Sequence, residues 1–390
     1  MVEVGGELID ELQRQLDVDE RWALTDGSGH LWWLSALPLR IWADSVAVPD
    51  SVPWIRLHAA TVVAEGVDPR PEVYRAIAAE NNAAIASALV LDAERQELSL
   101  HCQATFDMTQ PPGGRLDLFR TAVALQAAVA DLYGGALPLP AGKRPRIAHP
   151  ASGYRDEPSD LVKAAIPVIR QQSAKIPQIT RAELDAIQAQ LEEVSLWSIA
   201  GMGRLSLEVE AASDSPRIWF VATNGQGGPW NADATVPLRG VIKKLAKEQK
   251  QDPAVFHQIL WRSVEGPEAP ETGALRISTV DDHPVVGKGV LMLLLLPGRF
   301  PASLVGQLVN ALNLLEMAPP VPLTQFGAWS ARETGDDWEI GHSGFVPATF
   351  TGTQGSDARV DMIADLAGEI ALRGRIGDHF IREAYTGIDG

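Results

Sequence analysis

The succession of secondary-structure signals along residues 56–133 recurs along residues 290–373. In both stretches an apolar strand pattern is followed by an amphipathic helix pattern, two strand patterns around a polar turn, and a closing helix pattern. Pro71 and Pro301 stand at the start of the middle helices, a position that tolerates proline. Few residues are identical between the stretches, so the repeat rests on the order of elements. Such an order predicts two related copies of one module.

The first copy has a further helix and strands ahead of the repeated part, which gives the order α-β-β-β-α-β-β-α. We therefore predict an α+β fold of two tandem modules, each an antiparallel sheet covered by helices. The predicted elements of the first copy are a helix at 7–16, strands within 31–34, 39–42 and 54–63, a helix from Pro71, a hairpin of 88–91 with 98–106, and a helix at 118–132 that ends at Gly134-Gly135.

Three segments follow from this reading. Residues 1–138 form the first module, and residues 139–179 form a linker with a helix at 159–169 that Pro167 interrupts. Residues 180–390 form the second module. Thr180 and Glu183 have the spacing of a capping box at its first helix. Further elements expected there are strands at 204–210 and 217–223, an insertion or small separate domain at about 225–282, and helices near 238–249 and 252–264.

The composition limits what the chain can bind and where it works. A formal net charge of −17, spread along the chain, opposes binding to a phosphate backbone. The longest apolar run, residues 290–297, is far shorter than the roughly 20 residues of a membrane-spanning helix. The start of the chain lacks the basic and apolar regions of a secretory signal. We expect a cytoplasmic protein that binds no nucleic acid and does not insert into a membrane.

The one cysteine, Cys102, excludes an intramolecular disulfide and any multi-cysteine metal site. It lies on the apolar side of the alternating run at 98–106, so we interpret it as an inert core residue.

One segment approaches a nucleophile motif. Ile340-Gly-His-Ser-Gly-Phe345 has Phe345 where the final glycine belongs, and it lies within a predicted strand instead of a strand-to-helix turn. We interpret His342 and Ser343 as residues of an exposed strand face.

Three other segments resemble ligand sites only in part. Asp281-Asp282-His283 is interpreted as a polar turn before Pro284, because adjacent side chains do not converge on a metal. Gly287-Lys288-Gly289 lacks the remaining residues of a phosphate loop, and residues 225–228 lack dinucleotide-binding spacing. We therefore predict no catalytic residues, no metal ligands and no cofactor.

The tryptophans are the candidate partner-binding residues. The chain has 11, and Trp32, Trp33 and Trp42 fall on neighbouring predicted strands. Neighbours on a strand point to opposite faces, so Trp32 and Trp33 do not enter the same side of one core. An exposed indole would serve as a binding anchor. Burial under the first helix or under the other module is the open alternative.

The order of elements resembles that of the type III secretion chaperone-like superfamily, which includes putative bacterial sensory-transduction regulators and tandem-module proteins of high-GC bacteria. The segments that carry the resemblance are Leu31-Trp-Trp-Leu34, Arg56-Leu-His58, Ala79-Glu-Asn-Asn-Ala83, Gly327-Ala-Trp329 and Phe345-Val-Pro347. It covers roughly residues 5–135 and 181–375. The resemblance implies sheets that accept extended segments of a client protein and modules that pair two by two.

We therefore expect a non-enzymatic, chaperone-like pair of modules that recognises a partner or client protein. Two alternatives stay open: a structural or regulatory assembly factor that acts by self-association, and an enzyme whose site is assembled from scattered residues. Module pairing within the chain is expected, and a homo-oligomer is left open.

Overall fold

The computed structural model places helices and strands of an α+β protein in two compact units. It describes residues 2–26, 29–46, 54–106, 113–136, 142–193, 205–210, 273–283, 285–296, 298–317, 324–334, 337–351 and 355–386. Both units contain strands in antiparallel pairs together with helices, so the predicted α+β class is confirmed. No helix in these ranges is both long and apolar enough to span a membrane.

Each unit takes in a short segment from the opposite half of the sequence. Unit 1 comprises Met1–Ile77, Ala86–Val168 and Asn313–Ala328. Unit 2 comprises Ala78–Ile85, Ile169–Leu312 and Trp329–Gly390. The division expected from the sequence, at 138 and 180, does not include these reciprocal segments.

Unit 1 is built on a sheet of the order β1-β2-β3-β4-β6-β5, in which every neighbouring pair is antiparallel. The predicted hairpin of β5 and β6 is confirmed, and Gln96 in its turn has a positive φ of 55°. The sequence predicted three strands before the middle helix, whereas the structure has four there, because β1 was not predicted. The strands are β1 (Ala23–Asp26), β2 (Gly29–Trp32), β3 (Leu39–Val46), β4 (Trp54–Glu65), β5 (Ala88–Asp92) and β6 (Glu97–Phe106).

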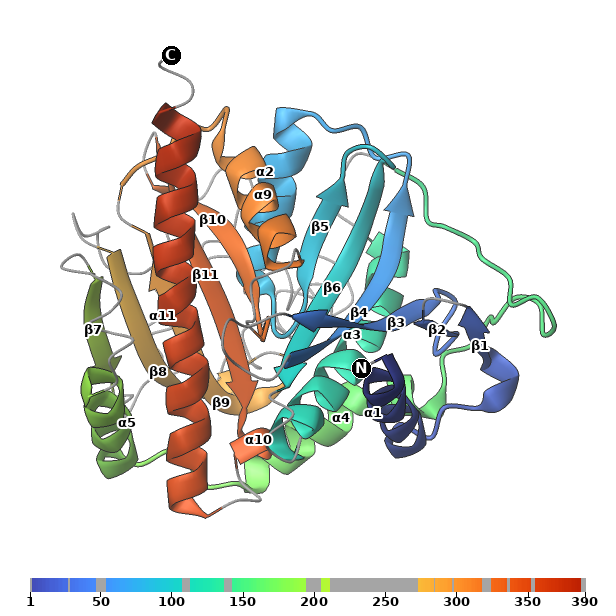
Figure 1. The fold of residues 1–390 in the computed structure, drawn as a ribbon, viewed down its shortest axis with the longest axis horizontal. Coiled ribbons are helices and arrows are strands. Elements are labelled where there is room, and N and C mark those ends of the chain that lie inside the picture. The colour runs from blue at the N-terminus through green and yellow to red at the C-terminus, as the bar shows by residue number, and fades with distance from the viewer. Residues whose placement is uncertain are drawn as a thin grey trace, which may run out of the picture. The chain divides into compact units, whose positions relative to one another are not determined.

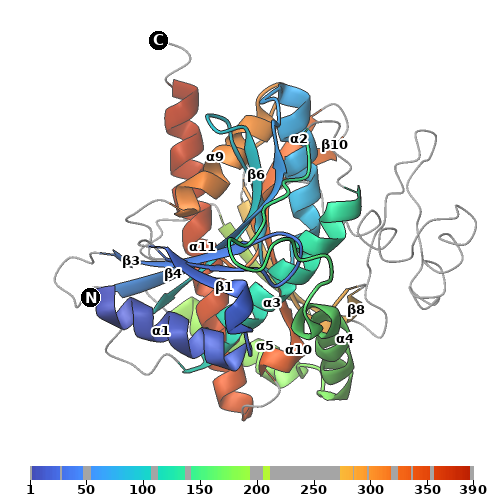
Figure 2. The same cartoon turned by 90° about the vertical axis from the view of Figure 1, so that its right-hand side faces the viewer.

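Helices α1 (Val2–Gln15) and α3 (Gly113–Ala136) cover one face of this sheet. Figure 2 shows both helices on the same side of β3 and β4. The apolar side of α1 faces inward as its spacing predicts, with Leu8, Ile9, Leu12 and Leu16 buried. The 3-10 helix η1 (Glu20–Trp22) lies between α1 and β1. Helix α2 (Pro71–Glu80) begins at its predicted proline and is followed by the 3-10 helix η2 (Asn81–Ala83).

The described part of the predicted linker belongs to the fold. Lys143 forms an antiparallel bridge with Glu65 at the end of β4, and the Ser159 N–H donates to the Leu34 carbonyl oxygen at 2.7 Å. Helix α4 (Asp160–Lys175) runs without a break through Pro167, so the predicted interruption was wrong.

Unit 2 contains a sheet of the order β10-β11-β9-β8-β7. The pairs of β9 with β8 and β11 are antiparallel, but β7 pairs with β8 in parallel, which corrects the expectation of wholly antiparallel sheets. Strand β8 falls inside the stretch that the sequence assigned to an insertion, so the end of that stretch is part of the sheet. The other elements predicted within 211–272 lie outside the described residues. The strands are β7 (Leu205–Glu210), β8 (Gly273–His283), β9 (Gly287–Leu295), β10 (Ala328–Thr334) and β11 (Asp337–Pro347).

Helices α5 (Arg181–Glu193) and α11 (Ser356–Thr386) pack together over the unit 2 sheet. In Figure 1, α11 crosses in front of β8 and β11. The predicted capping box is confirmed: the Thr180 N–H donates to Glu183 Oε2 at 2.8 Å, and the Glu183 N–H donates to Thr180 Oγ1 at 3.3 Å. The other helices are α9 (Val305–Met317) and α10 (Ala348–Thr351).

Candidate functional site

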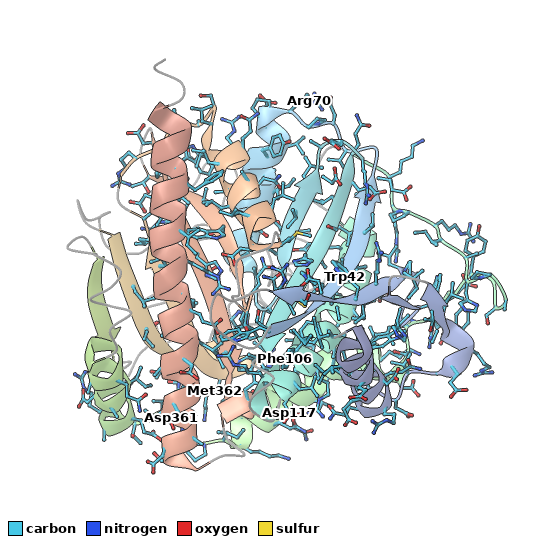
Figure 3. The ribbon with its side chains drawn as sticks, in the orientation of Figure 1. Trp42, Arg70, Phe106, Asp117, Asp361 and Met362 are labelled. Atoms are coloured by element: carbon cyan, nitrogen blue, oxygen red, sulfur yellow. The ribbon has the colours of Figure 1, made fainter. Side chains whose placement is uncertain are left out.

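The face of the unit 1 sheet that points away from α1 and α3 is polar. Residues directly opposite one another on antiparallel strands share a face. The register aligns Asp44 with Arg56 and Thr105, and it aligns Trp42 with His58 and Gln103. The strands therefore carry apolar residues on the helix-covered side, down to Phe106 at the end of β6 (Figure 3), and polar residues on the other side.

An ion pair stands at the start of this polar face. Arg56 Nε lies 3.0 Å from Asp44 Oδ1, and Arg56 Nη2 lies 2.8 Å from Asp44 Oδ2. The Arg56 side chain is 0% exposed, whereas that of Asp44 is 33% exposed. A guanidinium group without access to water requires a close acceptor, and the two-point pairing with Asp44 provides one.

From Asp44 a chain of ring nitrogens crosses the sheet. Asp44 Oδ2 lies 3.1 Å from His58 Nε2, and His58 Nδ1 lies 3.2 Å from His101 Nε2. His101 Nδ1 lies 2.9 Å from Gln325 Oε1. His58, His101 and Gln325 are 1%, 0% and 1% exposed. We call these four residues the buried polar chain.

The surroundings shift the pKa values of its members in defined directions. Burial lowers the pKa of His58, although Asp44 acts against this. Burial, followed by the neighbouring His58, lowers the pKa of His101 to about 3. Burial alone would raise the pKa of Asp44, but hydrogen bonds from His58 and Arg56 hold it well below its ordinary value. Neutral imidazoles next to an ionised Asp44 are therefore favoured at neutral pH.

Proton count decides the direction of the hydrogen bonds along the chain. If Gln325 presents its oxygen, His101 donates from Nδ1 and accepts at Nε2. His58 must then donate from both nitrogens, because Asp44 only accepts, and it carries a positive charge. If both rings are neutral, His58 donates to Asp44, His101 donates to His58, and Gln325 presents its amide nitrogen to His101.

Trp42 closes the outer end of the buried polar chain. Its indole is stacked on the His58 ring, with centroids 4.6 Å apart and an interplanar angle of 3°. The guanidinium carbon of Arg40 lies 5.4 Å from the centroid of the indole. Trp42 is half-buried and lies on β3, as Figure 3 shows.

Gln325, at the inner end of the buried polar chain, belongs to a segment of three residues from late in the sequence, Thr324–Phe326. We call Thr324–Phe326 the docked segment. Gln325 forms an antiparallel bridge with Gln103 of β6. The Thr105 N–H donates to Thr324 Oγ1 at 3.2 Å, and Arg115 Nη1 donates to the same oxygen at 3.1 Å. Strand β5 pairs with β6 only as far as His101, so the docked segment adds to the edge of β6 beyond its hairpin partner.

The chemistry open to this arrangement is positioning by hydrogen bonds. An Asp–His pair orients the base in a catalytic triad. Here the His58 nitrogen that would face a nucleophile faces a second imidazole, that of His101. The far end of the buried polar chain is the carboxamide of Gln325. The hydrogen bonds of the buried polar chain therefore fix the positions of β3, β4, β6 and the docked segment relative to one another.

The predicted anchors Trp32 and Trp33 are both enclosed, at 0% and 2% exposed. The Trp33 indole N–H donates to the Ile147 carbonyl oxygen at 3.0 Å, and its ring meets that of His149 edge to face with centroids 4.8 Å apart. The segment predicted as a linker thus covers one of the two neighbouring indoles. Of the three tryptophans, Trp42 alone is partly exposed.

The expectation that His342 and Ser343 lie on an exposed strand face was wrong. Both are in β11 as predicted, but they are only 0% and 6% exposed, so both faces of the strand are buried at this point. The His342 ring meets Trp329 edge to face with centroids 5.5 Å apart, and burial lowers the pKa of His342 well below its ordinary value.

Asp281-Asp282-His283 ends β8 and does not form the predicted turn. His283 Nδ1 accepts from the backbone N–H groups of Val285 and Val286, at 3.2 and 3.3 Å. Among the described residues, no group of three or more His, Cys, Asp or Glu side chains is placed to hold a metal ion. Residues 225–228 lie outside the described residues.

Lys288, between its two glycines, lies in β9 and donates from Nζ to the Ile176 carbonyl oxygen at 3.0 Å. Cys102 is buried, as predicted, and burial raises the pKa of its thiol to about 12.

Sequence reasoning did not single out the buried polar chain. A signal for it exists in Arg56-Leu-His58 and in His101-Cys-Gln103-Ala-Thr105, where polar side chains occupy every second position of strands that are otherwise apolar. Such alternation is also typical of a strand with one face in water. Partners of that face include Gln325 of the segment Thr324–Phe326, which no local pattern could assign to β6.

Comparisons of the chain with protein-family models, with curated proteins and with solved structures find no match.

Proposed function

We propose that this chain is a non-enzymatic, chaperone-like protein that binds extended segments of a partner protein, and that it consists of two copies of one module. The order of elements supports the second part. Unit 1 has β4, α2, β5, β6 and α3, and the corresponding order late in the chain is β9, α9, β10, β11 and α11. The strands lie in the orders β4-β6-β5 and β9-β11-β10 within their sheets.

One observation carries the proposed binding mode. In each unit, a segment from the opposite half of the sequence meets the last part of the long hairpin strand. In unit 1 this is the bridge of Gln325 with Gln103 on β6. In unit 2 the Phe345 N–H, near the end of β11, lies 3.5 Å from the Ile85 carbonyl oxygen. Addition of an extended segment to a strand edge is an established mode of peptide recognition, and the bridge of Gln325 with Gln103 is one instance of it within the chain.

A further strand edge in unit 1 offers a place for a partner. Strand β2 pairs with β3 only over Leu39–Ile41. Over the described residues, the following part of β3 is paired with β4 alone. We call Trp42–Ser45 the β3 edge. Trp42 and Asp44 in it are partly exposed and Ser45 is exposed. An indole next to an open edge fits the role of an anchor for a peptide side chain.

Site-specific photo-crosslinking in the native cell tests the proposal. A photoreactive amino acid at Ser45 is expected to form discrete adducts with another protein, and the additional change Trp42→Ala is expected to reduce them. The matched control places the same group at Asp117 of α3, whose side chain is 56% exposed. Equal adducts from both positions, or none from Ser45, would contradict partner binding at this edge. Adducts of two copies of the chain would favour self-association instead.

A further inference from the structure

We infer that β6 of unit 1 carries a binding site that selects an extended peptide by its side chains. The docked segment Thr324–Phe326 fills this site in the intact chain, and we call it the resident segment. The ligand class is a peptide with a hydroxyl, a carboxamide and an aromatic side chain at three successive positions. A partner chain with this order replaces the resident segment. The inference rests on the proposed function and adds the chemistry of the partner.

The first position is read by two donors. The Thr105 N–H and Arg115 Nη1 both point at Thr324 Oγ1, at 3.2 and 3.1 Å, and Thr324 is buried. An apolar side chain here would leave the Thr105 N–H without this acceptor and would remove one acceptor from Arg115, whose Nη1 also donates to the Thr105 carbonyl oxygen at 3.4 Å. A buried donor that loses its partner is destabilising, so the site discriminates for a hydroxyl.

The second position is read by His101. Gln325 Oε1 lies 2.9 Å from His101 Nδ1, deep enough that neither side chain is more than 1% exposed. A carboxamide pairs with an imidazole in either protonation state, because it offers an acceptor at one end and donors at the other. A charged side chain would enter this position only at the expense of its hydration. At the third position Phe326 is buried.

The resident segment leaves part of this site unused. The amide atom of Gln325 that faces away from His101 and the hydroxyl oxygen of Thr105 are buried and have no hydrogen-bond partner within the described part of the chain. Each such group weakens the hold of the resident segment. A ligand that pairs Thr105 Oγ1 through a neighbouring side chain gains that interaction and competes with Thr324–Phe326.

The resident segment has the advantage of covalent connection. A tethered segment acts at an effective concentration on the order of millimolar, which excludes weak ligands from the intact chain. The test therefore uses the full-length chain with a weakened occupant, Thr324→Ala with Gln325→Ala. The probe is a fluorescein-labelled synthetic peptide with the sequence of residues 319–328, and binding is followed by fluorescence anisotropy.

We expect this double variant to bind the peptide at least about tenfold more tightly than the unaltered chain does, because the tethered competitor is weakened. A peptide with the same residues in scrambled order should not bind, and Arg115→Ala added to the double variant should remove binding. Equal affinity for the scrambled peptide, or equal binding to the unaltered chain, would overturn the inference. If the double variant does not fold, Gln325→Asn takes its place with the same two outcomes. Crosslinking from Ser45 is independent of this assay, so the two proposals fail separately.

Discussion

His58 Nδ1 lies 3.2 Å from His101 Nε2, and both rings are out of contact with water. The first imidazole is held by Asp44 and the second by Gln325, so the two rings connect β3 with the docked segment across the width of the polar face. A proton added to either ring must be accommodated without water. The stability of unit 1 is therefore linked to the protonation of two histidines.

The first prediction concerns acid. Burial lowers the pKa of His101 to about 3 in the folded chain, below its ordinary value of 6.5, so the unfolded chain binds more protons between these values. The contribution of His101 to stability is complete above pH 6.5 and is lost as the pH falls toward 3. We expect a loss of about 2 kcal/mol between pH 7.5 and 5, measured by urea unfolding at each pH. His58, whose pKa is also lowered, adds to the loss.

Carboxylates act in a lower range and can be separated from this effect. Burial would raise the pKa of Glu183, but Arg359 and Thr180 lower it to about 2, so its contribution is complete above pH 4.5 and is lost below it. His101→Gln should flatten the stability curve between pH 7.5 and 5, whereas His30→Gln, outside the buried polar chain, should not. An unchanged slope in His101→Gln would exclude His101 as the group that titrates.

The second prediction concerns the ion pair. Asp44→Asn replaces one of two carboxylate oxygens by an NH₂ group, which cannot accept from Arg56 or His58. Loss of one partner from a buried pair costs about 3–5 kcal/mol, and the partial exposure of Asp44 reduces this to about 2–3 kcal/mol. Denaturant unfolding at pH 7.5 measures the change. The control Asp117→Asn, in an exposed pair with Arg120, should change stability by less than about 0.5 kcal/mol. Equal losses of stability in the two variants would mean that the Asp44–Arg56 pair contributes no more than an exposed ion pair.

Local rules account for the elements that the sequence predicted correctly. Pro71 at the start of α2, the capping box of Thr180 and Glu183, and the turn between β5 and β6 depend on neighbours within a few residues. Strand β1 was missed because its four residues, Ala23–Asp26, are too few to show alternation. The parallel pairing of β7 with β8 joins residues separated by more than 60 positions, and no local pattern encodes such a partner.

The candidate site was less predictable for the same reason. Alternation predicted that Trp32 and Trp33 point to opposite sides of one strand, but β2 ends at Trp32, and alternation could not show that Ile147 and His149 cover Trp33. The alternating polar residues on β4 and β6 were equally compatible with a sheet face exposed to water and with a buried polar face. One partner of this face, Gln325, is 224 positions from His101 along the chain.

The third prediction concerns the capping box in unit 2. Thr180→Ala removes one cap hydrogen bond and should cost about 1 kcal/mol. Glu183→Gln should cost more, about 2–3 kcal/mol, because the carboxylate also accepts from Ser356 Oγ at 2.7 Å and pairs with Arg359, both in the first turn of α11. Thermal and urea unfolding of both variants measure the difference. Asp185→Asn in the exposed pair with Arg181 is the control and should have almost no effect. A smaller effect for Glu183→Gln than for Thr180→Ala would contradict a link from α5 to α11.

The fourth prediction separates the tryptophans. Trp33→Ala leaves a cavity under Ile147 and His149 and should destabilise the chain by about 3–5 kcal/mol. Trp42→Ala removes a half-buried indole and should cost only about 1–2 kcal/mol. Urea unfolding of the two variants at one pH gives the comparison. Similar losses from both would mean that Trp42 acts in packing alone.

Trp42→Ala also has a spectroscopic signature. Burial is the largest cause of the lowered pKa of His58, and the indole stacked on this ring provides part of that burial. Removal of the indole admits water to the ring, so the pKa of His58 should rise toward its ordinary value, as followed by NMR titration of the imidazole. Trp33→Ala, whose indole meets His149 and not His58, is the matched control and should leave the His58 titration unchanged. If Trp42→Ala leaves this pKa where it was, the indole does not shield the buried polar chain. The β3 edge would then be an open strand edge without an aromatic cover, and crosslinks from Ser45 should be insensitive to Trp42.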